Sequence, residues 1–405
     1  MSLSGEGRIA RVEFTGARSE LFGLLFRGYL LMVPTIGIYR FWVATWKRRF
    51  YWQHTVLDGE PLEYTGNAMQ LLIGFLFALA FFLPIYIAFF YLSTQAPEIA
   101  GLGYLVIGAV FWFLMGYAIY KARDFRLSRT LWRGIRFAQH GNAWGYALRR
   151  FLWSIAMVVT LGLIYPWMAS NLWRYRYNNT WYGDCQFRWL GSWKTIAGPF
   201  FIVYFLIVAS VVGAVVVVGA SPIRYVDGMM LPSPEAFLGF LAAGLVAFLA
   251  WFYFRSREAT RMFSQVQVGD ARATVKVRAR ALFLQFVWYA LAALGVMMLI
   301  GALAGIVLTS MFTGATANPD AMAVDLARFA QLSWVNIALL IGGYLLIFGS
   351  LALLGEVFLG YGYWMLVARG ATISNADSLH SVRATGEDLA LAGEGLADAL
   401  NVGAY

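Results

Sequence analysis

Six long stretches of the sequence contain no charged residue, and these stretches limit the fold more than any other feature. A helix needs about 20 apolar residues to cross the hydrocarbon core of a membrane. Only 13% of all residues are charged, against roughly a quarter in soluble domains. The sequence therefore predicts six transmembrane helices, at residues 69–93, 99–120, 195–220, 236–254, 281–311 and 332–355.

The charges between these stretches predict their orientation. Residues 121–150 hold eight Lys or Arg against one Asp, and residues 255–280 hold seven against two acids. The segments 94–98, 221–235 and 312–331 carry more acids than bases. Because short basic segments stay in the cytoplasm, we expect both basic segments and both chain termini to be cytoplasmic.

Two further apolar segments, 21–42 and 149–171, are interrupted by proline and glycine. If both crossed the membrane, one of the two basic segments would lie outside the cell. Broken helices that enter and leave on the cytoplasmic side remove this conflict. Two interpretations therefore stay open for these segments: broken or re-entrant helices, and plain spans.

The sequence also repeats itself, because residues 35–66 align with residues 160–191 without a gap. The identical pairs are Thr35/Thr160, Gly37/Gly162, Trp42/Trp167, Ala44/Ala169, Arg49/Arg174, Thr55/Thr180 and Gly66/Gly191. A fainter third copy begins near residue 263, which indicates parallel repeats. We predict a cytoplasmic N-terminus at 1–20, repeat units at 21–120, 121–254 and 255–368, and an acidic cytoplasmic tail at 369–405.

Short polar segments beside the broken helices alternate in the manner of β-strands. They are "RVEFTG" (11–16), "PLEYTG" (61–66), "IRFAQHG" (135–141) and "CQFRWLG" (185–191). We expect small cytoplasmic β elements there. The predicted fold class is an all-α polytopic membrane protein with six spans, two broken or re-entrant helices and these small elements.

The strings "FTG…ELFGLL", "TIGIYRFW", "TLGLIYPW", "NLWRYRY" and "GEGLADALNVGAY" together resemble the YjgN family of bacterial inner-membrane proteins. The resemblance covers nearly the whole chain. Where a "TLGIY" form is usual, this chain has "PTIGIYRFW". The resemblance implies a multi-pass protein of the bacterial inner membrane. The family brings no agreed activity and no catalytic residues.

Aromatic and basic residues follow each broken helix, in "WKRRFYW" and "WRYRY". Tryptophan favours the membrane interface, and arginine pairs with lipid phosphates. The matching pairs Trp42/Trp167 and Arg49/Arg174 are therefore candidate contacts with anionic lipid headgroups or another anion. Simple anchoring of the chain at the interface is the alternative.

Arg27 and Glu356 are candidate polar groups at membrane depth. Charged groups within a membrane are costly and often functional. The alternatives are an interfacial position for Glu356, about 36 Å along its helix, and an Arg27 side chain that reaches the headgroups. An ion pair of Arg27 with Glu356 or Glu20 is a further interpretation.

No catalytic, phosphate-binding or metal-binding motif occurs in the sequence. The single cysteine, Cys185, excludes an internal disulfide and a multi-cysteine metal site. We therefore expect no enzymatic activity, no cofactor and no metal. The net charge of +10 is explained by topology, so the expected partner is the lipid bilayer and no nucleic acid is expected.

Two functions remain open at this stage. The scarcity of intramembrane charge favours a non-enzymatic scaffold or regulator of the cell envelope. The repeats and broken helices favour the alternative, a transporter or channel-like protein for a small solute or lipid.

Overall fold

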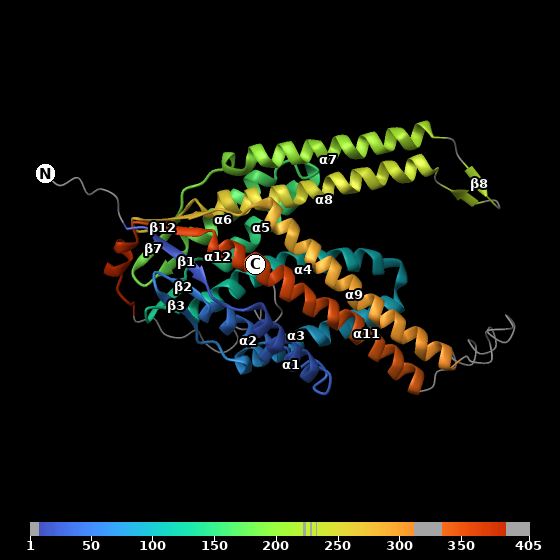
Figure 1. The fold of residues 1–405 in the computed structure, drawn as a ribbon, viewed down its shortest axis with the longest axis horizontal. Helices are drawn as coiled ribbons and strands as arrows, with labels where there is room; N and C mark the ends of the chain where they lie inside the picture. Colours follow the sequence, from blue (N-terminus) through green and yellow to red (C-terminus); the bar gives the residue numbers. More distant parts are fainter. Residues whose placement is uncertain (1–7, 222–223, 227–228, 232, 312–333, 386–405) are drawn as a thin grey trace.

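The fold was analysed in a computed structural model, which describes residues 8–221, 224–226, 229–231, 233–311 and 334–385. Ten short strands form a closed antiparallel barrel at one end, and long helices extend from it (Figure 1). The strands are β1 (Ala10–Phe14), β2 (Thr55–Leu57), β3 (Glu60–Tyr64), β4 (Thr130–Trp132), β5 (Ile135–Gln139), β6 (Thr180–Tyr182), β7 (Cys185–Trp189), β10 (Val266–Val268), β11 (Ala271–Val275) and β12 (Ala371–Ser374).

Four tight hairpins supply eight of these strands: β2–β3, β4–β5, β6–β7 and β10–β11. In the first hairpin Asp58 and Gly59 both have positive φ, at 51° and 84°, and Arg133 and Gly134 repeat this in the second. Two successive residues of positive φ match the twist of the flanking strands. The fifth pair comes from the chain ends, where Ala10 lies opposite Ile373.

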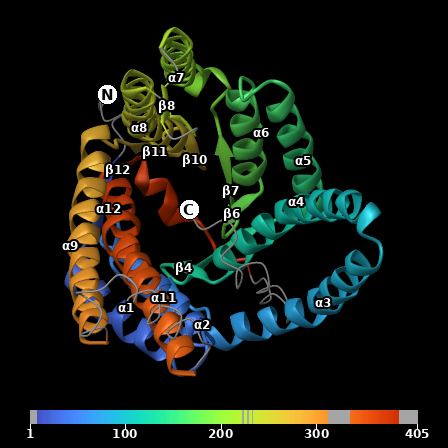
Figure 2. The ribbon, with the colours of Figure 1, turned by 90° about the vertical axis from the view of Figure 1, so that its right-hand side faces the viewer.

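Five pairs of helices connect the strand pairs. The helices are α1 (Arg18–Met32), α2 (Arg40–Gln53), α3 (Ala68–Gln95), α4 (Pro97–Ser128), α5 (Ala143–Val159), α6 (Tyr165–Asn178), α7 (Lys194–Ala220), α8 (Pro234–Phe263), α9 (Ala279–Met311) and α11 (Trp334–Leu354), which continues through η1 (Gly355–Gly360) and α12 (Tyr361–Arg369). A further hairpin, β8 (Arg224–Val226) and β9 (Met229–Leu231), lies between α7 and α8. Figure 2 shows the helix pairs arranged in a ring.

The same backbone hydrogen bond closes the base of every helix pair. The amide just after one strand pair donates to the carbonyl just before the next. The five bonds are Thr15 to His54, Thr65 to Arg129, His140 to Asn179, Leu190 to Gln265 and Lys276 to Gly370, at 2.8–3.0 Å. The chain therefore forms one local arrangement five times around the barrel.

Apolar side chains fill the interior of the barrel. Trp132 and Tyr182 are fully buried there and pack with residues from most of the other strands. Leu379, on the 3₁₀ helix η2 (Ala376–Ser381), joins the same cluster. Burial raises the pKa of Tyr182 to about 12, and its hydroxyl donates to the Trp132 carbonyl at 3.1 Å. The barrel is thus a packed core.

Two helix pairs are short and three are long. In α1–α2 the turn carries Ile36 and Gly37 at positive φ, and in α5–α6 Leu161 and Gly162 repeat this turn. The predicted breaks are therefore present, and in each case the chain returns to the barrel. Whether these short pairs enter a membrane stays a prediction.

Six helices are long and apolar enough to cross a membrane: Ala68–Gln95, Ala100–Ser128, Lys194–Ala220, Pro234–Phe263, Ala279–Ile306 and Ile337–Arg369. They contain the six predicted stretches, apart from the first residues of 99–120 and 332–355 and the last residues of 281–311. At most 17% of each apolar window is buried inside the chain. The apolar side chains therefore face outward from the chain, as is expected of helices that insert into a membrane.

The fold class and several boundaries need correction. The expectation of a mostly helical chain with six long apolar helices is confirmed, but the small β elements expected beside them form one closed ten-stranded barrel, so the class is not all-α. The predicted strand segments do form strands, namely β1, β3, β5 and β7. Within the closed sheet each of them pairs with strands that the sequence analysis did not predict. The basic segments 121–150 and 255–280 are helix ends and barrel strands rather than loops.

The chain ends also differ from expectation. Residues 1–20 contain strand β1, and the segment 369–405 begins with strand β12. Residues 386–405 of the predicted acidic tail, and the predicted external segment 312–331, lie outside the described residues. The division into three repeat units stays a prediction. Strands from every unit belong to the same barrel, so the barrel does not separate the units.

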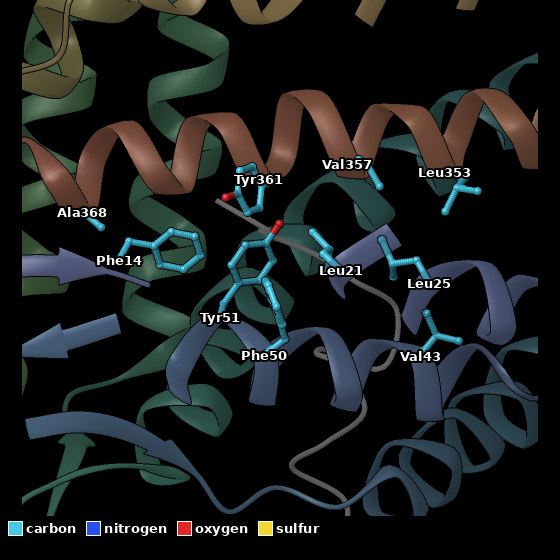
Figure 3. Packing of buried hydrophobic residues seen from close by; sticks show 10 residues of the cluster. All are labelled: Phe14, Leu21, Leu25, Val43, Phe50, Tyr51, Leu353, Val357, Tyr361 and Ala368. Atoms are coloured by element: carbon cyan, nitrogen blue, oxygen red, sulfur yellow. The ribbon is translucent and has the colours of Figure 1, made fainter. Parts of the chain in front are cut away.

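One apolar cluster fixes the two ends of the chain to each other. Phe14 of β1 packs against Tyr361 of α12 with ring centroids 5.6 Å apart, and Tyr51 of α2 lies against both (Figure 3). The Tyr361 hydroxyl donates to the Gly16 carbonyl at 2.8 Å. Buried aromatic contacts of this kind add stability beyond the area they bury.

We predict that cysteines placed at Gln53 and Gln95 react from opposite faces of the membrane. Gln53 is exposed where α2 meets the barrel, and Gln95 is exposed at the far end of α3. A helix of 28 residues is about 42 Å long and exceeds the hydrocarbon core. Labelling with a membrane-impermeant maleimide, in a Cys185→Ser background, measures this. Labelling of both positions from one face would contradict the arrangement.

Candidate functional site: a basic cavity on the helix side of the barrel

Five helices lead into the first strand of a pair, and their last turns enclose a cavity of about 550 Å³. They are α2, α4, α6, α8 and α12. Because closure of the barrel arranges these helix ends in a ring, side chains from distant parts of the sequence meet on one axis. The volume lies within the range of small-molecule sites.

Threonines anchor three of these helices to the barrel. Thr55, Thr130 and Thr180 are the first residues of β2, β4 and β6, and each hydroxyl donates to the carbonyl four residues earlier, at 2.7–2.8 Å. Each also accepts a bond from a side chain of the neighbouring helix pair. The donors are Trp364 to Thr55, Trp52 to Thr130 and Arg123 to Thr180, at 2.9, 2.8 and 2.9 Å.

The cavity is strongly basic. Among the described residues that line it, six are bases and one is an acid: Lys47, Arg48, Arg123, Arg126, Arg176 and Arg255 against Glu258. The remaining wall is largely aromatic, with Trp52, Trp173, Tyr177 and Trp364 among its residues. Such a wall lowers the local dielectric constant, which strengthens the field of the bases.

Ion pairs hold two of the bases at the edge. Arg255 lies 2.6 Å from Glu258, and the Tyr165 hydroxyl donates to the other oxygen of this buried carboxylate. Lys47 pairs with Glu356 at 2.8 Å. Among the described residues, Glu258 is therefore the one acid that lines the cavity, and Glu356 lies beside it as the partner of Lys47.

Two arginines that line the cavity, Arg123 and Arg176, have no carboxylate partner among the described residues. One guanidinium nitrogen of Arg123 donates to the Gln139 side chain, the Thr180 hydroxyl and the Arg176 carbonyl, at 2.8–3.1 Å. Arg176 lies over the Trp173 ring, and its Nε is buried with no acceptor among the described residues. A buried N–H without an acceptor is costly, so the described residues satisfy the Arg176 guanidinium only in part.

An apolar groove of about 600 Å³ adjoins the basic cavity. Its walls come from α8, α9 and the α11–η1 helix and carry Phe248, Trp251, Phe252, Leu282 and Phe286. Arg255 and Tyr363 line both spaces, and Glu356, the partner of Lys47, lines the groove. Glu356 lies on η1, a π-helical turn, and such turns occur frequently at functional sites.

The sequence-predicted pairs face outward, away from this cavity. Arg49 and Arg174 are exposed, and each donates to a glycine carbonyl, Gly66 at 3.1 Å and Gly191 at 3.0 Å. The two arginines therefore occupy equivalent positions, and both brace the loop that follows a strand pair. Lipid binding by these exposed guanidinium groups stays a prediction.

The two tryptophans are half-buried on the outer side of the same helices. Trp42 stacks on Tyr39 with centroids 5.6 Å apart, and Trp167 stacks on Trp193 at 4.5 Å. Arg27 is exposed on α1 and lines a shallow outer hollow with Glu20. The structure does not bring Arg27 to Glu356, because Glu356 pairs with Lys47.

Two of the cavity arginines lie on the same helices as residues that the sequence analysis singled out, but on a different face. Arg48 is buried and donates to the Tyr64 hydroxyl at 3.1 Å, while its neighbour Arg49 is exposed. Successive helical residues point about 100° apart, so the two cannot share a face. The sequence does contain a pattern that could have identified the cavity arginines. Arg48 and Arg123 each lie seven residues before one of the three anchoring threonines, and Arg126 and Arg176 each lie four residues before one.

A metal site does not form in the part of the chain that the structure describes: no group of three or more His, Cys, Asp or Glu gathers there. Two acids and six bases around the cavity suit an anionic ligand instead.

The comparisons with known proteins identify a family for the chain. A family described as "Bacterial protein of unknown function (DUF898)" matches residues 9–294, which is more than half of the chain. The chain belongs to this family. The DUF898 family is the YjgN-like group that the sequence motifs resemble. No curated protein and no solved structure is significantly similar to the chain.

The matched region of this DUF898 protein ends inside α9. It therefore includes nine of the ten barrel strands and four of the five helix ends around the cavity. The fifth, α12, brings Tyr363 and Trp364 from beyond the matched residues.

We predict that Arg49→Ala and Arg174→Ala each lower the free energy of unfolding by about 1 kcal/mol, because each removes the donor to a glycine carbonyl. Thermal unfolding in a non-ionic detergent measures the change. Arg27→Ala, at an exposed position on α1, is the matched control. An equal loss in all three variants would argue against the bracing role.

Proposed function

We propose that this protein binds an anionic, phosphate-type ligand in the basic cavity and serves as a membrane binding or transport protein for it. The observation that carries the proposal is the convergence of six bases on one cavity, where Arg123 and Arg176 have no carboxylate partner among the described residues. Taking unpaired charge out of water costs several kcal/mol per ion. A bound anion offsets that cost.

The side chains suit phosphate better than a small halide ion. Five of the six bases are arginines, and the planar guanidinium fork binds phosphate oxygens in pairs. Aromatic residues between them keep water away and strengthen each contact. The ligand class therefore has several oxygens and a charge greater than one.

The position of the cavity along the helices supports entry of the ligand from the membrane interface. On α4 the apolar stretch ends at Tyr120, and on α8 it ends at Phe254; the cavity bases on these helices come one to six residues later. If the six helices cross the membrane, the bases lie at the headgroup level on the barrel side. The packed barrel interior favours movement of the ligand from the helix side.

The other functional expectations remain proposals beside this one. A scaffold or regulator would use the barrel as its partner surface, and ligand binding is compatible with such a role. The absence of enzymatic activity, the bacterial inner-membrane location and the cytoplasmic termini stay predictions, as does the bilayer as partner.

We predict that inorganic pyrophosphate raises the unfolding temperature of the purified full-length protein at constant ionic strength. A ligand at 100 times its Kd stabilises a protein by about 2.7 kcal/mol. Arg176→Gln should weaken the apparent affinity about tenfold or more, because it removes the donor and the charge together.

Arg174→Gln is the matched control for this experiment. It removes the same charge from the same helix, but from the exposed face. Each variant is compared with its own unfolding temperature in the absence of pyrophosphate. No shift in the wild-type protein, or the same shift in both variants, would refute an anion site in the cavity.

A further inference from the structure

The basic cavity does not end at its ring of charges. Arg255 and Tyr363 form a wall that it shares with the apolar groove, and the Lys47–Glu356 pair connects the two spaces from the other side. One ligand can therefore contact both. The groove and the cavity have similar volumes, about 600 and 550 Å³.

The two spaces differ in chemistry. In the groove, aromatic and aliphatic side chains predominate, and its charged lining residues, Arg255 and Glu356, lie at the end next to the cavity. Along α8 the groove runs from Arg255 back to Phe248, seven residues or about 10 Å toward the middle of the apolar stretch. A free phosphate gains nothing from such a wall.

We infer that the ligand is an amphiphile: a phosphate-bearing membrane lipid whose headgroup occupies the basic cavity and whose acyl chain lies in the groove of α8, α9 and α11–η1. This inference rests on the proposed function, since the headgroup site is the same cavity. It adds the second half of the ligand, and it explains why an apolar groove opens beside six bases.

Burial of methylene groups gives the groove its contribution to affinity. Each buried CH₂ contributes roughly 0.8 kcal/mol, or about a fourfold gain in affinity. Even a few methylenes in the groove therefore outweigh a single hydrogen bond to the headgroup. The lipid phosphate fixes orientation, because the bases lie at one end only.

A substitution at Ala352 tests the groove without touching the charges. Ala352 lines the groove on α11 and is exposed, so Ala352→Trp places a large ring in the space where the chain would lie. Ala302→Trp is the matched control, because Ala302 is an exposed alanine on α9 that does not line the groove.

The experiment measures binding of dodecyl phosphate and of inorganic phosphate to the full-length protein in a neutral detergent, by native mass spectrometry and thermal shift. We expect dodecyl phosphate to bind at least 100-fold more tightly than inorganic phosphate. Ala352→Trp should reduce that advantage at least tenfold and leave inorganic phosphate binding unchanged. Ala302→Trp should behave as the wild-type protein.

The outcomes separate the two proposals. If inorganic phosphate binds and dodecyl phosphate binds no more tightly, the anion site stands and the lipid inference is wrong. If dodecyl phosphate keeps its advantage in Ala352→Trp, the chain binds elsewhere and the groove inference is wrong. If neither probe binds, both proposals fail. Loss of both probes in Ala352→Trp, with unfolding at room temperature, calls for Leu282→Trp as the second groove variant, judged by the same criteria.

Discussion

The pairing of the two chain ends is the constraint on which the rest of this structure depends. Strand β1 pairs with β2 on one side and with β12 on the other, so residues more than 350 positions apart complete the sheet. Without that pair the barrel is an open sheet with two unpaired edges, which proteins avoid. Closure fixes where each of the five helix pairs begins and ends, and the five equivalent backbone hydrogen bonds follow from it.

Closure also explains why so much positive charge meets in one place. Each helix that leads into the barrel brings its last two to three turns to the rim, and four of the five carry at least one base there that lines the cavity. On a separate helix such a base is ordinary interface chemistry. In a ring the same bases face one another, and their repulsion favours a shared anion. The proposed ligand site is therefore a product of topology more than of any single motif.

Much of the helical part could be predicted from the sequence, because length and lack of charge are local properties. The six apolar stretches match the six long helices, and the strands at 11–16, 61–66, 135–141 and 185–191 are present, shortened by one or two residues. Closure could not be predicted, since the pairs β7–β10 and β1–β12 join strands that the sequence separates widely. The residues of the cavity were not predicted from the sequence, for a different reason. Arg49 and Arg174 drew attention because they are identical in the aligned repeat, whereas Arg48, Arg123 and Arg176 converge only after the ring is built.

The number of helix pairs gives a reason for the position of the groove. Around the barrel the pairs follow the order short, long, short, long, long, from α1–α2 to α9–α11. With five members a ring cannot alternate throughout, so two long pairs must be neighbours once. That junction lies between α7–α8 and α9–α11, and it is where the apolar groove opens. The helices of a short pair are about 25 Å long or less. A groove between a short pair and a long pair would therefore have only one long side. Two adjacent long pairs supply both sides, and the shared Arg255 then leads from the groove to the bases.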